Sequence, residues 1–294
     1  MSVCWIDGKF VAESEAKVSI FDHGLLYGDG VFEGIRFYNN QAFRLDNHLN
    51  RLMDSARAIA LTLPYAKDEF VTAVNQVIQQ FDLDSGYIRL VITRGKGSLG
   101  INPSSCLKSS AFIIADKSNF IDKRVLERGA KLIIAATRRL AADGLDPRIK
   151  SLNYLNHILA RMEATQAHAD EAILLNAQGN VTEGSTDNIF IVKNNKIITP
   201  AISDGALDGI TRGIMFEIAD EQGFDCEAKT LSPYDLYTAD ECFLTGTAME
   251  LLPVSEVDGR LLSSCPGEMY KILQHHFKEK ILSESNTIQY NRAG

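Results

Sequence analysis

The chain lacks a surplus of basic residues and any long apolar run, and each absence removes a class of protein. Its 294 residues include 30 Lys and Arg against 38 Asp and Glu, for a net charge of −8. A general nucleic-acid binder needs a basic surplus to neutralise phosphates, so this charge argues against one. No apolar run approaches the roughly 20 residues of a membrane-spanning helix. Residues 1–10 show no basic-then-apolar signal pattern, so we expect a cytoplasmic protein that binds neither membrane nor nucleic acid.

Paired-cysteine, metal-binding and P-loop motifs are also missing. The five cysteines are scattered and include no C-x-x-C pair, so we interpret them as reduced thiols of a cytosolic protein. His275 and His276 are adjacent and therefore diverge on a helix, which disfavours a zinc site. No G-x-x-x-x-G-K-[ST] motif occurs. We expect neither a metal site nor a P-loop nucleotide site.

The chain is long enough for two domains. With 45% hydrophobic and 23% charged residues, it has the composition of a folded protein. Predicted strands and helices alternate in the first part, which is an α+β pattern. The polar run from Asp116 to Asn119 is the best candidate boundary, and the part beyond it is richer in predicted strands. We predict a smaller domain over residues 1–118, a connecting segment over 119–129 and a larger domain over 130–294.

Arg51 lies on a predicted amphipathic helix of the first domain. Asp46 is placed to cap the start of this helix. Arg51 lies off the centre of the apolar stripe, which we expect to be buried. The stripe consists of Leu49, Leu52, Met53, Ala56, Ile59 and Ala60.

Lys150 stands between a connector with helix-breaking residues, Asp143 to Pro147, and a predicted helix from Ser151 to Met162. Ser151 or Asn153 could cap that helix. The position suits an amine presented into a cleft, and it is also an ordinary place for a surface lysine. Apolar residues recur at helical spacing after it, at Leu152, Leu155, Ile158, Leu159 and Met162.

Three other stretches could bind an anion. Gly209-Ile210-Thr211 follow Asp208 at the start of a predicted helix, where backbone N–H groups attract phosphate or where Asp and Thr act as plain caps. Tyr87 and Arg89 share one face of a predicted strand, which is either an anion-binding wall or an exposed face. The stretch from Thr245 to Ala248 is a hydroxyl-rich turn that offers donors or is simply a turn.

Glu183 lies in a polar run from Thr182 to Asn188, ahead of an apolar predicted strand. By itself the run predicts a loop. A carboxylate held on such a loop could accept a charge-assisted hydrogen bond from a cofactor nitrogen.

Taken in order, these motifs resemble the branched-chain amino-acid aminotransferases, which are fold-type IV pyridoxal-phosphate enzymes. The resemblance runs from about Trp5 to about Gly259. It implies an α+β, or α/β, two-domain fold with a smaller α/β N-terminal domain and a larger, β-rich pseudo-barrel C-terminal domain. The motifs are Tyr27-Gly28-Asp29-Gly30-Val31-Phe32-Glu33-Gly34-Ile35-Arg36, Arg51, Tyr87-Ile88-Arg89, Lys150 to Asn156, Glu183-Gly184, Gly209-Ile210-Thr211-Arg212 and Thr247-Ala248.

The resemblance implies a role for each motif in binding pyridoxal 5′-phosphate. Lys150 is the catalytic lysine and joins the cofactor aldehyde covalently. Glu183 bonds the pyridine nitrogen and keeps it protonated, so that the ring can accept electrons. Tyr154 bonds the ring hydroxyl, and Leu207 packs on the ring face. The phosphate is held by Arg51, Ile210, Thr211 and Thr247, of which the middle two act through the helix N-terminus.

The resemblance also implies a substrate site and a homodimer, with a hexamer as a further assembly. Phe32 lines an apolar side-chain pocket, and Arg89 is the candidate for the γ-carboxylate of glutamate. The backbone N–H groups of Thr247 and Ala248, together with Tyr87 and Arg89, hold substrate carboxylates. The other subunit of the dimer contributes Tyr27 and Ile101.

The implied activity is transamination of branched-chain L-amino acids (Leu, Ile, Val) with 2-oxoglutarate, which gives branched-chain 2-oxo acids and L-glutamate. The amine of Lys150 moves the substrate Cα proton, and general-base transfer of this kind is worth about two to four orders of magnitude. The implied place of the enzyme is branched-chain amino-acid biosynthesis.

Relatives of the same fold are the competing interpretations. A D-amino-acid aminotransferase is similar at Tyr27-Gly28-Asp29-Gly30 and around Lys150, but has an Arg-x-His carboxylate trap where this chain has Leu99 and Ile101. An aminodeoxychorismate lyase fits the motifs around Phe32 and Tyr87 less well. An amine transaminase that accepts R-amines is a further alternative. From a different class, a catalytically silent anion-binding protein is disfavoured because Lys150 and Glu183 are both present.

Overall fold

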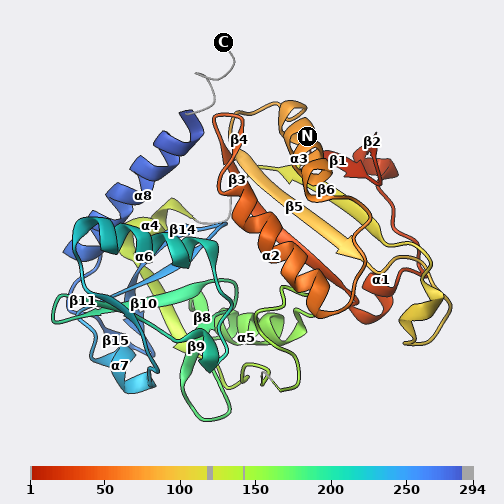
Figure 1. Ribbon diagram of the computed structural model, residues 1–294. Helices are drawn as coiled ribbons and strands as arrows, with labels where there is room; N and C mark the ends of the chain where they lie inside the picture. Colours follow the sequence, from red (N-terminus) through yellow and green to blue (C-terminus); the bar gives the residue numbers. More distant parts are fainter. Residues whose placement is uncertain (1, 118–121, 142, 287–294) are drawn as a thin grey trace. The chain divides into compact units, whose positions relative to one another are not determined.

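The computed structural model describes residues 2–117, 122–141 and 143–286. These residues form two compact units, shown in Figure 1. The first unit contains the described residues within 1–118, 149–153 and 281–294, and the second those within 119–148 and 154–280. The contacts therefore group 149–153 with the first unit, although the predicted boundaries would place them in the second domain. The predicted connecting segment contains a helix, α4 (Lys123–Arg128), and its residues 119–121 lie outside the described part.

The first unit is built on an antiparallel sheet of six strands in the order β2-β1-β6-β5-β3-β4. Tight turns join its hairpins: Asp7-Gly8 connects β1 to β2, and Asn39-Asn40 connects β3 to β4. All four turn residues have positive φ angles, which Asn, Asp and Gly tolerate. The strands are β1 (Val3–Ile6), β2 (Lys9–Val11), β3 (Gly30–Tyr38), β4 (Gln41–Ala42), β5 (Gly86–Thr93) and β6 (Ser110–Asp116).

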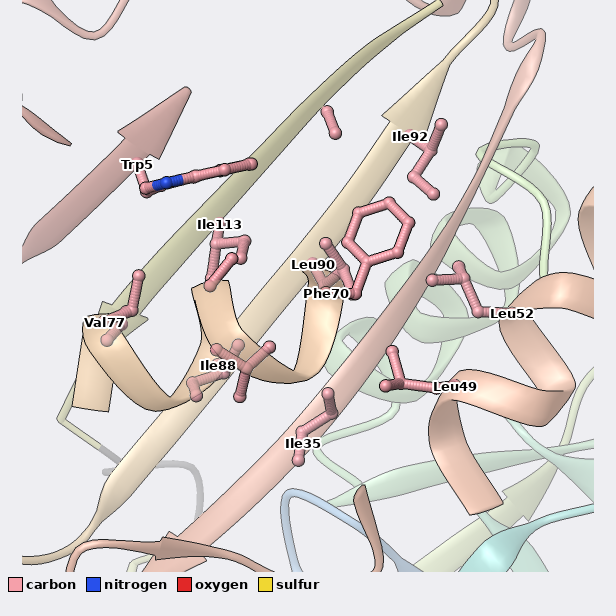
Figure 2. Close-up of a cluster of buried hydrophobic side chains, with 14 of the residues drawn as sticks. Trp5, Ile35, Leu49, Leu52, Phe70, Val77, Ile88, Leu90, Ile92 and Ile113 are labelled. Carbon is pink, nitrogen blue, oxygen red and sulfur yellow. The ribbon is translucent and has the colours of Figure 1, made fainter. Parts of the chain in front are cut away.

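Two helices, α2 (Leu45–Ala58) and α3 (Lys67–Gln79), cover one face of this sheet. Figure 2 shows apolar side chains from β3, β5 and β6 meeting those of α2 and α3. Leu49 and Leu52 of the predicted stripe are fully buried. The predicted cap at Asp46 is wrong, because the helix begins one residue earlier and its N-cap is Arg44, which makes no capping hydrogen bond. Asp46 instead lies in the first turn, where its charge suits the helix dipole.

The second unit is built on a mixed nine-stranded sheet with the order β12-β11-β10-β13-β14-β7-β8-β9, while β15 pairs with β14. The sheet curls, and β9 contacts β10. The predicted pseudo-barrel is therefore confirmed. The strands are β7 (Ala130–Ile134), β8 (Glu171–Leu175), β9 (Val181–Gly184), β10 (Asn188–Lys193), β11 (Lys196–Thr199), β12 (Cys226–Ala228), β13 (Glu241–Gly246), β14 (Glu250–Val257) and β15 (Arg260–Leu261).

Besides α4, the described part of the second unit contains three further helices and most of a fourth. They are α5 (Leu155–Gln166), α6 (Ile210–Gln222), α7 (Pro233–Tyr237) and α8 (Glu268–Asn286). The first unit also has one short helix, α1 (His23–Tyr27), and 3-10 turns lie at Glu13–Glu15, Pro103–Ser105 and Ile202–Asp204. In the described ranges we find no helix with the length and apolar character that crossing a membrane requires.

Helix α5 differs from its predicted form. It begins at Leu155 with Tyr154 at the N-cap, so neither Ser151 nor Asn153 caps it. The predicted apolar stripe is not the buried face. Small residues, Ala160 and Ala164, pack against β8 instead, because their size lets the helix approach the sheet closely. The larger apolar residues Leu155, Ile158, Leu159 and Met162 are 45–68% exposed.

Candidate active site

Lys150 lies on an extended segment of the first unit rather than at a helix start. Its carbonyl accepts a hydrogen bond from Phe32 N–H at 3.0 Å, and Leu152 N–H donates to the Gly30 carbonyl at 3.0 Å. Its own N–H donates to Ser55 Oγ at 3.1 Å. Strand β3 and helix α2 therefore fix the backbone on which the amine is mounted.

The Lys150 amine and the Arg89 guanidinium both lie against the ring of Phe32. Lys150 Nζ is 4.6 Å from the ring centroid, and Arg89 Cζ is 3.5 Å from it. Phe32 itself is only 3% exposed. Two cations thus contact one aromatic ring, whose π face attracts positive charge. Phe32 and Arg89 are on the face of the sheet opposite the apolar core, as the period of two requires.

Tyr87 shares this face with Arg89, which confirms that their side chains point the same way along β5. Both side chains are half-buried, between buried neighbours. The Tyr87 hydroxyl lies directly over Gly34 of β3, where an added Cβ would stand 2.1 Å from the oxygen. Gly34 therefore makes room for the Tyr87 hydroxyl beside Phe32.

Arg51 makes a bidentate ion pair with Glu33, a residue to which the sequence analysis gave no role of its own. Arg51 Nε and Nη2 donate to the two Glu33 oxygens at 2.7 and 2.9 Å. His48 Nδ1 is 2.7 Å from Glu33 Oε2. The Glu33 side chain is fully buried, whereas the Arg51 side chain keeps 13% of its surface exposed. Glu33 thus fixes the orientation of the guanidinium.

The charges within this triad follow from its neighbours. Burial alone would raise the pKa of Glu33, but the charge of Arg51 and the hydrogen bonds from His48 and Arg51 outweigh it and hold that pKa well below its usual range. Burial lowers the pKa of His48, with Glu33 acting against it. We infer an ionised Glu33 and a neutral His48 whose Nδ1–H is the donor. A buried Glu three residues before a strand Arg, with His-x-x-Arg on the next helix, is a signal that sequence reasoning could have used.

Tyr27 and Ile101 lie on an exposed part of the first unit. The backbone N–H of Gly100 donates to the Tyr27 hydroxyl at 2.8 Å, which ties the loop that carries Ile101 to helix α1. Tyr27 is 37% exposed and Ile101 is 83% exposed. Ile101 therefore fills no buried pocket of this chain.

Glu183 lies on strand β9 of the second unit, so the predicted loop is wrong: every residue of the strand is buried. Its Oε2 accepts a hydrogen bond from Leu207 N–H at 2.8 Å. Arg139 Nε is 2.9 Å from Glu183 Oε1 and donates to the Gly205 carbonyl at 3.2 Å. Arg139 is a cation that sequence reasoning missed, because no spacing links it to Glu183.

Leu207 is held beside Glu183 from its other side. Asn188 Nδ2 donates to the Leu207 carbonyl at 2.9 Å. Asn188 Oδ1 also lies against Gly209, where an added Cβ would stand 2.0 Å away. The structure thus brings Glu183, Leu207 and the start of α6 together.

A glycine stands at the start of α6. The N-cap is Gly209, and no side chain makes a capping hydrogen bond to the helix. The alternative of a plain Asp or Thr cap is therefore wrong. Ile210 and Thr211 occupy the first turn, where N–H groups and the helix dipole favour an anion.

Tyr154 and Ala248 line one pocket of about 540 Å³ in the second unit, together with Ser185 and Thr186. The Tyr154 ring stacks on His157, with ring centroids 4.6 Å apart. His157 Nδ1 in turn is 2.8 Å from the Ser185 carbonyl oxygen. Thr247 and Ala248 form the turn between β13 and β14 and are half-buried. His157 supports Tyr154, and the sequence analysis did not identify it.

The profile of the Amino-transferase class IV family matches residues 30–257. The chain therefore belongs to the class IV aminotransferases. It is 47% identical over 276 residues to the putative branched-chain-amino-acid aminotransferase of Methanocaldococcus jannaschii, covering 94% of this chain and 95% of the relative. It is 37% identical to the branched-chain-amino-acid aminotransferase of Pseudomonas aeruginosa, covering 89% and 87% of the two chains.

Solved structures show the same fold. The branched-chain aminotransferase of the archaeon Thermoproteus uzoniensis with norvaline has a TM-score of 0.90 and 36% identity, covering 98% of this chain and 97% of the other. The branched-chain amino acid aminotransferase of Thermobaculum terrenum in its PLP form has a TM-score of 0.85 and 29% identity, covering 95% and 93%. These likenesses confirm the fold-type IV prediction.

Proposed function

We propose that this protein is a branched-chain-amino-acid aminotransferase. It transfers the amino group of leucine, isoleucine or valine to 2-oxoglutarate and produces branched-chain 2-oxo acids and L-glutamate. The observation that carries this proposal is the ring of Phe32, which contacts the Lys150 amine and the Arg89 guanidinium. The pocket of such an enzyme must accept an apolar side chain and a carboxylate in turn, and an aromatic ring beside a cation suits both.

The residues present fit pyridoxal 5′-phosphate. Glu183 is a buried carboxylate that accepts from Leu207 N–H and lies 2.9 Å from Arg139 Nε, which suits a protonated ring nitrogen. Arg51 is a guanidinium that a carboxylate holds in place, and α6 adds first-turn N–H groups behind a glycine N-cap; both kinds of group suit a phosphate. We propose that the phosphate contacts come from Arg51, Ile210, Thr211 and Thr247, with Leu207 on the ring face and Tyr154 at the ring hydroxyl.

When bound, the cofactor supplies an aldehyde that takes the amino group and a ring that accepts electrons from the substrate Cα. Lys150 Nζ removes the proton from the substrate Cα and later returns one. Its extended backbone, bonded to β3 and to Ser55, limits the positions that the amine can reach. Positioning of this kind is the contribution that the described contacts support.

Substrate selection depends on the sheet face that carries Phe32, Tyr87 and Arg89 and on the turn that carries Thr247 and Ala248. Arg89 binds the γ-carboxylate of glutamate, and the Tyr87 hydroxyl is placed beside it. The Thr247 and Ala248 N–H groups bind the α-carboxylate. Phe32 contacts the apolar side chain of the donor. Leu99 and Ile101 offer no charge, so neither side chain binds a carboxylate.

We also propose a homodimer in which Tyr27 and Ile101 line the site of the second copy. The support is an exposed apolar area on the first unit. Leu99 and Ile101 flank Gly100, whose N–H donates to the Tyr27 hydroxyl of α1, and together with Leu25 and Leu107 they are 64–95% exposed. Exposed apolar side chains that lie together mark association surfaces. Sedimentation of the purified protein measures the assembly, and a monomer at micromolar concentration contradicts this part of the proposal.

The test of function combines a donor screen with a lysine replacement. With 2-oxoglutarate as acceptor, L-leucine and L-valine are consumed, whereas D-alanine and (R)-1-phenylethylamine are not. Activity with D-alanine alone would overturn the substrate assignment. Lys150→Ala lowers kcat by at least about a thousandfold, as expected for loss of a general base, and abolishes borohydride trapping of the cofactor on the protein. Lys9→Ala, an exposed lysine of β2, is the control and leaves both unchanged.

A further inference from the structure

Asp187 is a buried acidic residue to which the proposed function gives no role. It lies in the turn between β9 and β10 and is only 5% exposed. Among the residues that the structure describes, no donor group bonds to either of its carboxyl oxygens. A buried carboxylate without donors is costly, so the environment of this side chain needs an explanation.

The groups that face Asp187 are mostly acidic. Glu171 of β8 and Glu183 of β9 act on it as negative charges, and Arg161 of α5 is the opposing cation. Cys242 of β13 also faces it. Glu171 is itself well supported: its Oε1 accepts from Ala172 N–H at 2.6 Å and Ser185 N–H at 3.2 Å, and its Oε2 is 3.1 Å from Arg161. Arg161 is therefore already paired with Glu171.

Two glycines let the Asp187 side chain contact two turns at once. An added Cβ on Gly184 would stand 1.9 Å from Asp187 Oδ1. An added Cβ on Gly246 would stand 3.5 Å from Asp187 Cβ. Gly184 directly follows Glu183, and Gly246 directly precedes Thr247. The carboxyl group of Asp187 is thus packed between the turn next to the ring-nitrogen carboxylate and the turn that offers donors to substrate and phosphate.

We propose that Asp187 is a positioning residue, held as a neutral carboxylic acid between the turn after Glu183 and the turn before Thr247. The neutral side chain holds these two turns at a fixed spacing. It also leaves Glu183 as the ionised carboxylate for the cofactor nitrogen. The cofactor part of this inference rests on the proposed function; the protonation of Asp187 does not.

The protonated form follows from charge and burial. A carboxyl group that is buried and receives no hydrogen bond pays a large cost for its charge, so it retains a proton. Burial, together with the charges of Glu171 and Glu183, raises the pKa of Asp187 well above its ordinary value, with Arg161 opposing. Glu171 has two N–H donors and Arg161, so the proton belongs on Asp187.

The first experiment needs no cofactor. Because the pKa of Asp187 is raised on folding, the folded state binds more protons than the unfolded state, and stability falls as pH rises above about 4. Asp187→Asn removes this titration. We expect the Tm of the cofactor-free variant, relative to wild type, to increase from pH 4 to pH 8 by at least about 2 °C.

Asp240→Asn is the matched control, because its trend has the opposite sign. A hydrogen bond from Asn194 N–H, with Lys193 nearby, lowers the pKa of Asp240. Its stabilisation is therefore present at neutral pH and lost at low pH. If Asp187→Asn lost stability with rising pH in the same way, Asp187 would be ionised and the inference would be wrong.

The second experiment uses the holoenzyme. Asp187→Asn keeps a neutral donor of the same shape, so kcat and the midpoint of the pH titration of the cofactor's visible absorbance stay within about threefold and about 0.5 pH unit of wild type. Asp187→Ala removes the donor and the packing and raises the cofactor dissociation constant at least about tenfold. Equal impairment of the two variants, or a shifted midpoint in Asp187→Asn, overturns the positioning role. A wild-type protein that binds no cofactor contradicts the proposed function, while the cofactor-free comparison still tests the protonation.

Discussion

Each unit contains a buried carboxylate beside an arginine, and the two pairs are used in opposite ways. In the first unit Glu33 holds Arg51, and the arginine is the proposed ligand contact. In the second unit Arg139 lies beside Glu183, and the carboxylate is the proposed ligand contact. The Glu33–Arg51 pair is bidentate, and the arginine is the more exposed partner. The Glu183–Arg139 pair is a single contact, and Leu207 N–H supplies the other bond.

The comparison shows that burial does not decide the charge of a carboxyl group by itself. Glu33 and Asp187 are both buried, yet two cationic or donor groups hold the pKa of Glu33 well below its usual range, whereas burial without a donor, together with neighbouring carboxylates, raises that of Asp187. The groups next to each buried carboxyl group decide whether it is charged. Three substitutions test this contrast.

Glu33→Gln has the largest expected effect. It leaves the charge of Arg51 buried without its anion, and breaking a buried pair typically costs about 3–5 kcal/mol of unfolding free energy. Because the pKa of Glu33 is lowered on folding, its stabilisation is present above the unfolded pKa and lost as pH falls. Urea denaturation at pH 7 and at pH 4 measures the loss of unfolding free energy and its dependence on pH. The difference in unfolding free energy between wild type and Glu33→Gln is smaller at pH 4.

Glu15→Gln is the control for that loss. Glu15 makes an exposed contact with Lys17, with both side chains about two-thirds exposed or more, and exposed pairs contribute little. A Glu33→Gln protein as stable as wild type at pH 7 contradicts the view that Glu33 supports Arg51.

Arg139→Met has the next largest effect. It removes the cation beside Glu183 and the bond to the Gly205 carbonyl. We expect a loss of about 2–3 kcal/mol, below that of Glu33→Gln because Leu207 N–H still bonds the carboxylate. The variant also binds the cofactor less tightly, as absorbance titration would show. Arg138→Met, one residue earlier, is the control. If Arg139→Met had the same stability and cofactor affinity as Arg138→Met, Arg139 would not support Glu183.

Arg51→Lys has the smallest effect of the three. Lysine keeps the charge but loses the two-point contact with Glu33. We expect a cofactor dissociation constant higher by about tenfold, which is about 1.4 kcal/mol, with little change in stability. Arg57→Lys, an exposed arginine of the same helix, is the control. If Arg51→Lys lost more stability than Arg139→Met, the predicted order of these two substitutions would be wrong.

Periodicity predicted much of this protein because it reflects short-range geometry. The alternation of β5 correctly placed Tyr87 and Arg89 on one face, and the stripe of α2 correctly placed Leu49 and Leu52 in the core. Ordered motifs indicated the fold-type IV family and its cofactor. These inferences need only neighbours along the chain or the order of short segments.

Other features depend on packing between distant segments. The buried face of α5 was predicted wrongly from its large apolar residues. Its alanines form the buried face, because they allow closer contact with β8. The predicted loop at Glu183 is a buried strand, because β8 pairs with it. The sequence shows His-x-x-Arg on the helix after Glu33, but only the fold brings both side chains to that carboxylate, and no spacing links Glu183 to Arg139.

The sequence by itself determined which chemical groups this chain carries, their order, and the alternation that gives each strand its two faces. Only the tertiary structure decided which carboxyl group has a cation beside it and which has another carboxyl group. Charge states follow from close contacts between residues far apart in the chain, such as the 2.7 to 2.9 Å that separate Glu33 from His48 and Arg51, and electrostatic energies are large at such short distances. For that reason Glu33 and Asp187, indistinguishable as acidic residues in the sequence, hold opposite protonation states in the fold.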